Sequence, residues 1–329
     1  MSDGAVTVRV RRDFPQVIDY VVGQARMAGR IGSPLTKVRI NGTDHVATVS
    51  VPRTTGSSAS WKLTFRDLPG VELTAHVEIA NGVMTWSIPH IVDTANHRVN
   101  TVSVPGLALA SVTSADPKAQ LSSASIVVDR NKTGDLFQPL ATTDVSQDTS
   151  WVAMANDSTL AAGFEDNATQ DDLVGSAATV ARFVHSISQV EGTKVGAIEP
   201  ATWVHRGKGS ATACPTDSLG NKAVCQLPGG ATVQDGIGPD PDTPYVRVKI
   251  VADANTDGKV DWQDAAVATR DVTMQPTGSG DVANKVITHI PFNIVSQATH
   301  PFLRTLDDVK HISLATDGLG QQALLKGYQ

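Results

Sequence analysis

The chain has 329 residues, of which 40% are hydrophobic and 18% are charged, and its formal net charge at pH 7 is −6. This composition is typical of a mildly acidic, soluble globular protein; it excludes a small disulfide-stapled scaffold and a basic nucleic-acid-binding surface. No apolar run reaches the roughly 18 residues of a transmembrane helix, and the N-terminal stretch MSDGAVTVRVRRDF lacks the apolar core of a signal peptide.

From residue 5 to about residue 250, short runs rich in Val, Thr, Ile and Ser alternate with Gly, Pro, Asn and Asp. These runs include AVTVRVRR, KVRING, HVATVSV, WKLTF, VELTAHVEI, MTWSI, RVNTVSV, ASIVVD, VARFVHSIS and YVRVKIV. Alternation with period two and frequent turn residues predicts antiparallel β-structure in a sandwich or barrel. Since no linker interrupts the pattern, we expect one large two-sheet sandwich over residues 1–250.

Several side chains in this region have both a functional and a structural interpretation. The tryptophans lie in or beside apolar strands, so we expect them to fill the core and not to form a sugar-stacking platform: Trp61, Trp86, Trp151 and Trp203. The histidines lack the close pairing of a metal site and are expected to be structural: His76, His90 and His97. The following carboxylates are expected in a solvated loop and not in a catalytic pair: Glu165, Asp166, Asp171 and Asp172.

Cys214 and Cys225 bracket the turn-rich segment PTDSLGNKAV and are the only cysteines in the sequence. An even count around such a loop favours a hairpin closed by a disulfide, which fits an oxidising compartment. The alternative is two reduced cysteines in a surface loop. Zinc is less favoured, because only His205 lies close in sequence as a further ligand.

Residues 253–264 read DANTDGKVDWQD and match the loop of an EF-hand calcium site. Gly258 occupies the sixth position, where the loop must turn sharply. The six predicted Ca²⁺ ligands are Asp253, Asn255, Asp257, the backbone carbonyl of Lys259, Asp261 and Asp264. Four carboxylates this close together would repel one another without a cation, which favours a bound metal over an acidic turn without one.

The surroundings of this loop differ from those of a calcium sensor. A predicted strand, Tyr245–Val251, precedes it and a helix beginning at Trp262 follows it, so no entering helix is present to move. Asp264 stands where a longer Glu usually binds through both oxygens. We therefore expect a structural Ca²⁺, with a sensor and a metal-free acidic turn as the alternatives.

After Asp264 the pattern changes to alternating helix and strand. AAVATRDV predicts a helix, residues 285–294 a strand, THPFLRTLDDVK a turn and a helix, and HISLATDGLG a strand that runs into a glycine turn. Alternating elements indicate an α/β domain with two strands of a parallel sheet. Because two such strands leave an open, half-covered sheet, we expect the chain to be a fragment of a longer protein.

The runs DGKVDWQDAAVATRD and PFLRTLDDVKHISLATDGLGQQALLKGY resemble the start of the catalytic domain of the endo-α-N-acetylgalactosaminidases, a family of bacterial glycoside hydrolases. Upstream, DFPQVIDYVVG, SPLTKVRING and VNTVSVPG resemble the galactose-mutarotase-like β-sandwich of that family. The resemblance implies a mainly β chain, with this large sandwich over residues 1–250. It is followed over residues 251–329 by the truncated start of a (β/α)8 barrel, which includes the calcium loop 253–264.

The resemblance also implies an activity for the parent protein: removal of Galβ1-3GalNAc, the core 1 disaccharide, from Ser and Thr of mucin-type O-glycosylated glycoproteins, with retention of configuration. Retention requires two carboxyl groups about 5 to 5.5 Å apart, and in the family both lie on later barrel strands. The resemblance therefore implies no catalytic residue in this chain, an inactive isolated chain, and a secreted or cell-surface bacterial parent.

Asp317 is the one residue of this chain that we expect to contact substrate. It follows the predicted strand HISLAT, and the carboxyl ends of barrel strands carry the active site. The alternative is that Asp317 starts an Asp-Gly turn. The sequence thus leaves two functions open: a fragment of a glycoside hydrolase, or a non-catalytic, calcium-stabilised β-sandwich that binds carbohydrate or other domains.

Overall fold

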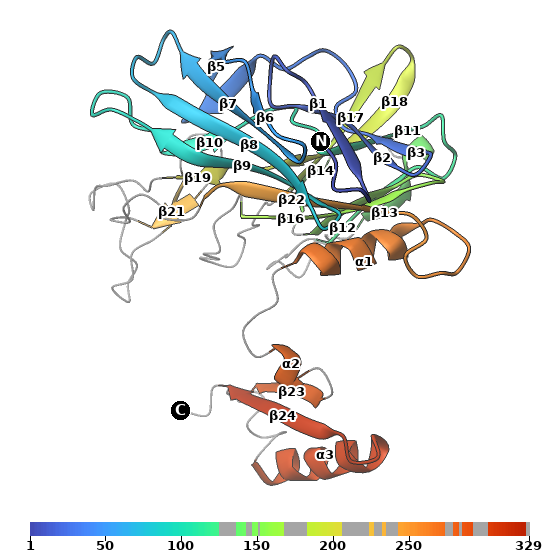
Figure 1. Cartoon of the computed structure of the whole chain (residues 1–329). Helices are drawn as coiled ribbons and strands as arrows, with labels where there is room; N and C mark the ends of the chain where they lie inside the picture. The colour runs from blue at the N-terminus through green and yellow to red at the C-terminus, as the bar shows by residue number, and fades with distance from the viewer. Residues whose placement is uncertain are drawn as a thin grey trace. The chain divides into compact units, whose positions relative to one another are not determined.

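The structure, a computed structural model, describes residues 1–124, 136–142, 147–150, 152–167, 183–205, 224–226, 232–234, 243–273, 279–282, 285–291 and 302–326. The chain forms two compact units, Met1–Thr273 and Met274–Gln329 (Figure 1).

The first unit consists mainly of strands, several of which coincide with the runs predicted from the sequence. Its elements are β1 (Thr7–Val10), β2 (Val17–Val22), β3 (Ala25–Ala28), β4 (Lys37–Ile40), β5 (Thr43–Val49), β6 (Arg53–Thr54), β7 (Ser58–Phe65), β8 (Glu72–Ala80), β9 (Val83–Val92), β10 (Thr101–Ser103), β11 (Ala110–Thr113), β12 (Gln120–Ala124), β13 (Leu136–Pro139), η1 (Leu140–Thr142), β14 (Gln147–Ser150), β15 (Val152–Asn156), β16 (Ala161–Asp166), β17 (Phe183–Val190), β18 (Thr193–Pro200), β19 (Trp203–Val204), β20 (Val224–Gln226), β21 (Thr232–Gln234), β22 (Tyr245–Val251) and α1 (Trp262–Val272).

Two large antiparallel sheets account for most of these strands. In the described residues, a seven-stranded sheet has the order β1-β2-β3-β11-β18-β17-β14. A larger sheet has the order β13-β12-β15-β16-β22-β9-β8-β7-β5-β4-β10-β19, and β6 pairs with β7. The short strands β20 and β21 pair with each other. This arrangement confirms the predicted β-sandwich.

One hydrophobic core joins the two sheets. Val8 and Tyr20 enter it from the seven-stranded sheet, and Leu63 and Trp86 enter it from the larger sheet. The indole of Trp86 stacks on that of Trp203, with ring centroids 5.6 Å apart, and its Nε1 donates to the carbonyl oxygen of Pro15 at 2.8 Å. Trp61 is equally buried. These three tryptophans are core side chains, as predicted, whereas Trp151 lies outside the described residues.

The prediction of a solvated acidic loop is wrong for Glu165 and Asp166. Both belong to β16 and are buried, at 5% and 0% exposure. Pairing of β16 with β22 places Glu165 opposite Arg247, and the guanidinium Nη1 donates to the carboxylate at 3.3 Å. A cation on the neighbouring strand therefore allows the carboxylate to leave water. Asp171 and Asp172 lie outside the described residues.

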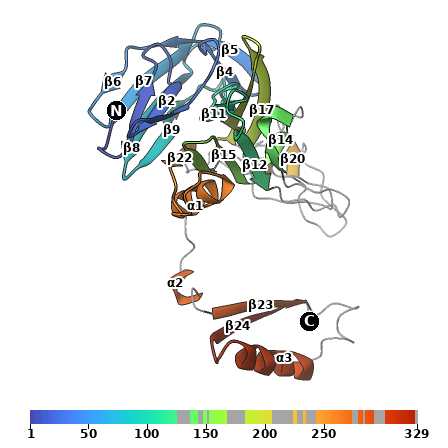
Figure 2. The ribbon, with the colours of Figure 1, turned by 90° about the vertical axis from the view of Figure 1, so that its right-hand side faces the viewer.

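Helix α1 begins at Trp262, as predicted, and packs on β15, β16 and β22 (Figure 2). Its small and apolar side chains Ala265, Ala268 and Val272 are buried in this contact. The helix comes so close to the sheet at Gly163 that a Cβ there would lie 2.2 Å from the backbone nitrogen of Thr269. Glycine at this position therefore permits the packing.

The second unit contains α2 (Ser279–Val282), β23 (Lys285–Pro291), α3 (Phe302–Ala315) and β24 (Gly320–Lys326). Strands β23 and β24 pair in parallel, so β23, α3 and β24 form a βαβ motif. A parallel pair of strands is thus present, as predicted, and its first strand begins at the predicted residue. In the described ranges, no helix is long and apolar enough to span a membrane.

The second of these strands is not the predicted one, because His311–Ala315 belongs to α3. In the segment HISLAT, apolar and polar residues alternate over only a few positions. The residues before it carry apolar side chains at helical spacing, namely Phe302, Leu306 and Val309, and the helix continues through the segment. Ion pairs one helical turn apart, such as Arg304 with Asp308 at 3.5 Å, also support the helix. The strand forms after the glycine turn instead.

Candidate functional site

The acidic loop begins directly after β22 and ends in α1, as the sequence predicts. Its backbone curls through two residues in the left-handed region, Thr256 at φ 61° and Gly258 at φ 83°. Glycine adopts such angles without steric cost, which explains its place at the sixth position. The loop therefore turns where the calcium-loop pattern requires it to turn.

The first half of the loop gathers side-chain oxygens around its own amides. The two carboxylate oxygens of Asp253 accept from the backbone nitrogens of Asp257 at 3.0 Å and Gly258 at 2.8 Å. The side-chain oxygen of Asn255 accepts from the same Asp257 nitrogen at 3.1 Å. Since both side chains contact one N–H, their oxygens converge on one side of the loop. Asp257 in turn accepts from the backbone nitrogen of Lys259 at 3.0 Å.

The second half of the loop forms the start of α1. Asp261 is the N-cap and accepts from the backbone nitrogen of Gln263 at 2.8 Å, while the Asp264 carboxylate accepts from the nitrogen of Asp261 at 2.9 Å. The two aspartates form a capping box. Asp264 is 1% exposed and also accepts from the nitrogens of Ala254 at 2.7 Å and Asn255 at 3.1 Å. It therefore joins the two ends of the loop.

These capping roles could have been found in the sequence. The spacing of two acidic residues three positions apart, immediately before an apolar helical run, is a variant of the capping-box pattern. The calcium-loop interpretation assigned Asp261 and Asp264 to a metal and did not consider this role. The structure shows that both residues also have a purely structural reason to be acidic.

The donor set fits calcium in its chemistry, since every predicted ligand is an oxygen. In the described residues, however, no three His, Cys, Asp or Glu side chains form a group that could hold a metal ion. The reason is visible in the contacts above, because the carboxylates face backbone amides of the loop. Calcium binding by Asp253, Asn255, Asp257, Lys259, Asp261 and Asp264 therefore stays a prediction.

Asp317 lies in the turn between α3 and β24, with φ 50°, and is exposed. The nitrogen of Gly318 donates to the carbonyl oxygen of Ser313 at 2.8 Å, which closes the end of the helix in the manner of a Schellman motif. Asp317 thus precedes a strand, whereas the substrate contacts of a barrel follow its strands. The argument that Asp317 contacts substrate because it follows a strand therefore no longer applies. The role of Asp317 itself stays untested.

The remaining predicted residues are not part of the loop sequence. Cys225 belongs to β20, but Cys214 lies outside the described residues, so the disulfide stays a prediction. The Nδ1 atom of His76 lies 2.7 Å from the hydroxyl oxygen of Ser60, and its Nε2 atom lies 3.6 Å from a carboxylate oxygen of Glu78. These contacts agree with the structural role expected of His76.

Comparison with known proteins identifies the class of this fold. The family model described as "Galactose mutarotase-like fold domain" matches residues 1–262, so the sandwich belongs to that class. The family model described as "Endo-alpha-N-acetylgalactosaminidase" matches residues 263–329. A protein of Renibacterium salmoninarum, provisionally named as an endo-alpha-N-acetylgalactosaminidase, is 39% identical over 335 residues, which cover 100% of this chain.

The chain therefore belongs to the galactose mutarotase-like fold family over residues 1–262, and residues 263–329 match the endo-α-N-acetylgalactosaminidase family, which confirms the resemblance seen in the sequence. It spans about a fifth of the length of this curated relative, 21%.

Proposed function

We propose that this chain is part of a retaining endo-α-N-acetylgalactosaminidase that releases Galβ1-3GalNAc from Ser and Thr of mucin-type glycoproteins. The observation that carries the proposal is the 39% identity across the whole chain, sandwich and βαβ motif alike. A βαβ motif is also the repeating unit of a (β/α)8 barrel. In this proposal the chain supplies the sandwich and the first barrel strands.

The catalytic carboxylates, in this proposal, belong to later strands of that barrel. Retention needs two carboxyl groups about 5 to 5.5 Å apart around the scissile bond. Positioning them requires a rigid pocket, since proximity and orientation contribute roughly 7 to 11 kcal/mol to the lowering of a barrier. Two parallel strands and one helix offer no such pocket. We therefore expect the 329-residue chain to lack glycosidase activity by itself.

The test compares this chain with a version extended through a complete barrel. Both are incubated with an aryl α-glycoside of Galβ1-3GalNAc, and the released phenol and the anomer formed first are measured by absorbance and NMR. We expect the extended protein to release the disaccharide as its α-anomer and the 329-residue chain to release none. The aryl α-glycoside of GalNAc alone is the control for specificity. Comparable turnover by the short chain would refute the assignment of the carboxylates, and no turnover by the extended protein would refute the proposed activity.

We also propose that a structural Ca²⁺ binds the acidic loop and ties β22 to α1. The ion would offset two of the four negative charges of the carboxylates and replace some of their contacts with backbone amides. A ligand that binds only the folded state stabilises it by about 2.7 kcal/mol at one hundred times its Kd. The melting temperature should therefore rise with calcium and fall with a chelator in the native chain. It should respond little in the variant Asp253→Asn plus Asp257→Asn.

Asp271→Asn provides the control for this experiment, because it removes a carboxylate of α1 outside the loop that pairs with Lys249 at 2.7 Å. This variant should keep the full calcium response. An unchanged melting temperature of the native chain in calcium would instead identify the loop as a metal-free acidic turn.

The last part of the proposal concerns the location of the parent protein, which acts on O-glycosylated glycoproteins and would be secreted or exposed on a bacterial surface. A disulfide between Cys214 and Cys225 would fit this oxidising environment and would contribute roughly 2 to 3 kcal/mol. Thiol titration of unreduced, denatured protein tests the bridge. Two free thiols in protein produced under oxidising conditions would refute it.

A further inference from the structure

Two β-hairpins of the larger sheet turn through the same dipeptide, Asn-Gly, which occurs twice in the sequence. Asn41 and Gly42 join β4 to β5, and Asn81 and Gly82 join β8 to β9. In each hairpin the residues that flank the dipeptide pair with each other, so both turns have only two residues. All four turn residues have a positive φ, between 51° and 82°. Positive φ at both central positions defines a type I′ turn, for which Asn-Gly is a preferred sequence. The two turns therefore share sequence and backbone conformation.

An Asn-Gly dipeptide carries a reaction of its own. The backbone nitrogen of the glycine attacks Cγ of the asparagine side chain, and a bond forms between these two atoms. The side-chain nitrogen leaves as ammonia, together with the proton of the attacking nitrogen, and a five-membered succinimide ring results. Water then opens the ring at either carbonyl group, which leaves aspartate or isoaspartate. Glycine favours the first step because it has no side chain to shield its nitrogen. Since both dipeptides have this chemistry, their surroundings decide which of them reacts.

The side chain of Asn41 is tied to a neighbouring segment. Its Nδ2 donates to the carbonyl oxygen of Arg98 at 2.6 Å, and its Oδ1 accepts from the backbone nitrogens of Asn100 at 2.7 Å and Thr101 at 3.1 Å. The backbone nitrogen of Asn41 also donates to the carbonyl oxygen of Thr101 at 3.0 Å. Before a ring can form, the amide must break three hydrogen bonds and rotate toward the nitrogen of Gly42. The structure therefore opposes the reaction at Asn41.

The side chain of Asn81 has no such restraint. It is exposed and makes no hydrogen bond within the part of the chain that the structure describes. A Cβ placed on Gly82 would meet nothing within 4 Å, so the space beside the turn is open. The nitrogen of Gly82 donates to a carboxylate oxygen of Asp3, whose side chain is itself exposed. This contact holds the backbone of the turn but leaves the asparagine amide free to rotate toward the nitrogen.

We propose that Asn81 is a site of spontaneous deamidation in the folded protein, and that Asn41 is protected from the same reaction by its hydrogen bonds to residues 98–101. The reaction consumes only water. The site belongs to the sandwich, and the proposal does not depend on hydrolase activity.

Deamidation would change a contact of the N-terminal segment. The carboxylate of Asp3 accepts from the backbone nitrogens of Ala5 and Val6, both at 3.0 Å, and from that of Gly82, so it ties this segment to the hairpin. The hydrogen bonds from Val6 and Gly82 lower the pKa of Asp3 and keep its carboxylate ionised. A new carboxylate at residue 81 adds a second negative charge beside it, and isoaspartate also adds a methylene group to the main chain of a two-residue turn. The hydrogen bond from Gly82 to Asp3 should therefore weaken in the modified protein.

The test follows both asparagines in one sample of the 329-residue chain. The folded protein is aged at mildly alkaline pH and digested under acidic conditions, and mass spectrometry measures the one-dalton gain of each Asn-Gly peptide. An isoaspartyl methyltransferase with a labelled methyl donor detects the isoaspartate. We expect Asn81 to convert at least roughly tenfold faster than Asn41, since the loss of a single hydrogen bond already accounts for a factor of this order.

Unfolded protein in urea is the control for intrinsic reactivity, because both dipeptides lose their surroundings there and the difference in rate should largely disappear. Asn81→Gln would have to form a larger ring and should yield no product at this position in a chain that still folds. Amide hydrogen exchange at Gly82 should become faster as the native chain ages and stay constant as the variant ages. Equal rates at Asn41 and Asn81 in the folded chain, or an undiminished difference in urea, would overturn the proposal.

Discussion

The two units of this chain bury their apolar side chains to very different extents. In Met1–Thr273, a single core runs between two antiparallel sheets and includes fully buried Trp, Tyr and Phe side chains. Among the side chains of Met274–Gln329 whose burial the structure describes, Thr305 is the one buried side chain, at 7% exposure, while Leu303, Leu314 and Leu324 are 77%, 79% and 60% exposed. Sheet type explains the contrast. Antiparallel sheets can pack face to face as a complete sandwich, whereas parallel strands are normally covered on both faces by further elements.

The contrast teaches that the two units have different requirements for folding. The sandwich buries the apolar faces of its own strands in one core, whereas the βαβ motif leaves apolar side chains such as Leu303 and Leu324 exposed. We therefore expect most of the stability of this chain to reside in the first unit, and the predictions below test that expectation in order of decreasing effect.

Core truncation should affect only the first unit strongly. Trp86→Ala removes a buried ring that stacks on Trp203 at 5.6 Å, and it should lower the free energy of unfolding by roughly 3 to 5 kcal/mol. Leu314→Ala, at a position 79% exposed, should change it by less than about 0.5 kcal/mol. Urea denaturation followed by tryptophan fluorescence and far-UV circular dichroism measures both. Effects of similar size would contradict the comparison.

Acid should destabilise the sandwich through His185. This side chain is fully buried, its Nε2 lies 3.3 Å from the carbonyl oxygen of Ser122, and burial lowers its pKa to about 4. The unfolded chain protonates the same imidazole near pH 6.5 and therefore binds more protons between these values. Stability should fall by roughly 3 kcal/mol as the pH drops from about 6.5 to about 4.

His185→Gln should remove this part of the pH dependence. Urea unfolding of the native chain and of the variant between pH 7.5 and pH 4 measures the difference in slope. Parallel pH profiles would show that the imidazole is protonated in the folded state.

The cap at the start of α1 should contribute less to the free energy of unfolding than a large core side chain does. It should contribute more than an exposed carboxylate of the same loop. Asp264→Ala leaves three backbone N–H groups without their acceptor and should cost roughly 2 to 3 kcal/mol. Asp257→Ala, at an exposed position of the same loop, should cost less than about 1 kcal/mol in a calcium-free buffer. Thermal unfolding monitored by circular dichroism compares them, and equal losses would place the structural role elsewhere in the loop.

The smallest effect on stability should come from the surface of the second unit. Leu303→Glu plus Leu314→Glu replaces two exposed leucines of α3 and should leave the melting temperature of the sandwich unchanged within about 1 °C. The same change should reduce self-association, since exposed apolar patches promote it. Light scattering at increasing concentration measures this. Loss of the sandwich transition in this variant would reveal that the two units depend on each other.

The sequence predicts the sandwich well because period-two alternation is a local signal, and strands such as β8 and β22 carry it over their full length. Trp61 and Trp86 follow from the same pattern. The failure at His311–Ala315 has a physical cause, because a few alternating residues cannot be distinguished from the end of an amphipathic helix. Contacts across the helical turn, such as Lys310 with Asp307 at 3.8 Å, favour the helix.

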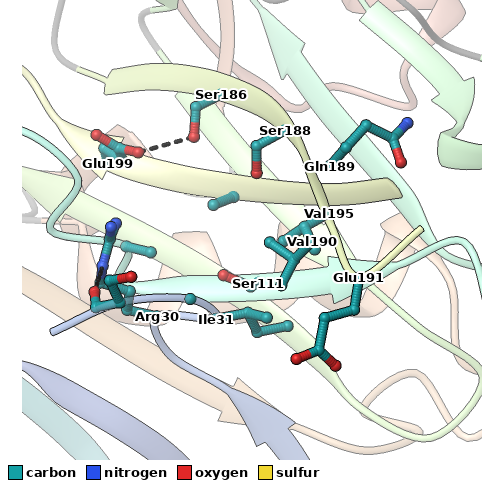
Figure 3. Close-up of a pocket in the computed structure, with 14 residues that line it drawn as sticks. Arg30, Ile31, Ser111, Ser186, Ser188, Gln189, Val190, Glu191, Val195 and Glu199 are labelled. Carbon is teal, nitrogen blue, oxygen red and sulfur yellow. Dashed lines mark hydrogen bonds between the residues drawn. The ribbon is translucent and has the colours of Figure 1, made fainter. Parts of the chain in front are cut away.

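The sites were only partly predictable. The order of oxygen donors in the acidic loop is visible in the sequence, but the binding of three amides by the Asp264 carboxylate is not. A hollow of about 520 Å³ on the face of the seven-stranded sheet that points away from the core could not be predicted (Figure 3). Ala28, Ser111 and Ala197 are far apart in sequence, and only the strand pairing brings them side by side. Sequence patterns describe one strand at a time, whereas a hollow on a sheet face depends on the register between strands.

The close packing of α1 on Gly163 has a consequence for how such domains can be exchanged between proteins. The two family models meet between residues 262 and 263, yet α1 runs from Trp262 to Val272 and packs within the compact unit that ends at Thr273. A recombination event at that junction would remove the helix from β15, β16 and β22 and leave their outer face bare. Gene fusions that transfer this sandwich should therefore carry α1 with it, so that the inherited module ends after the helix.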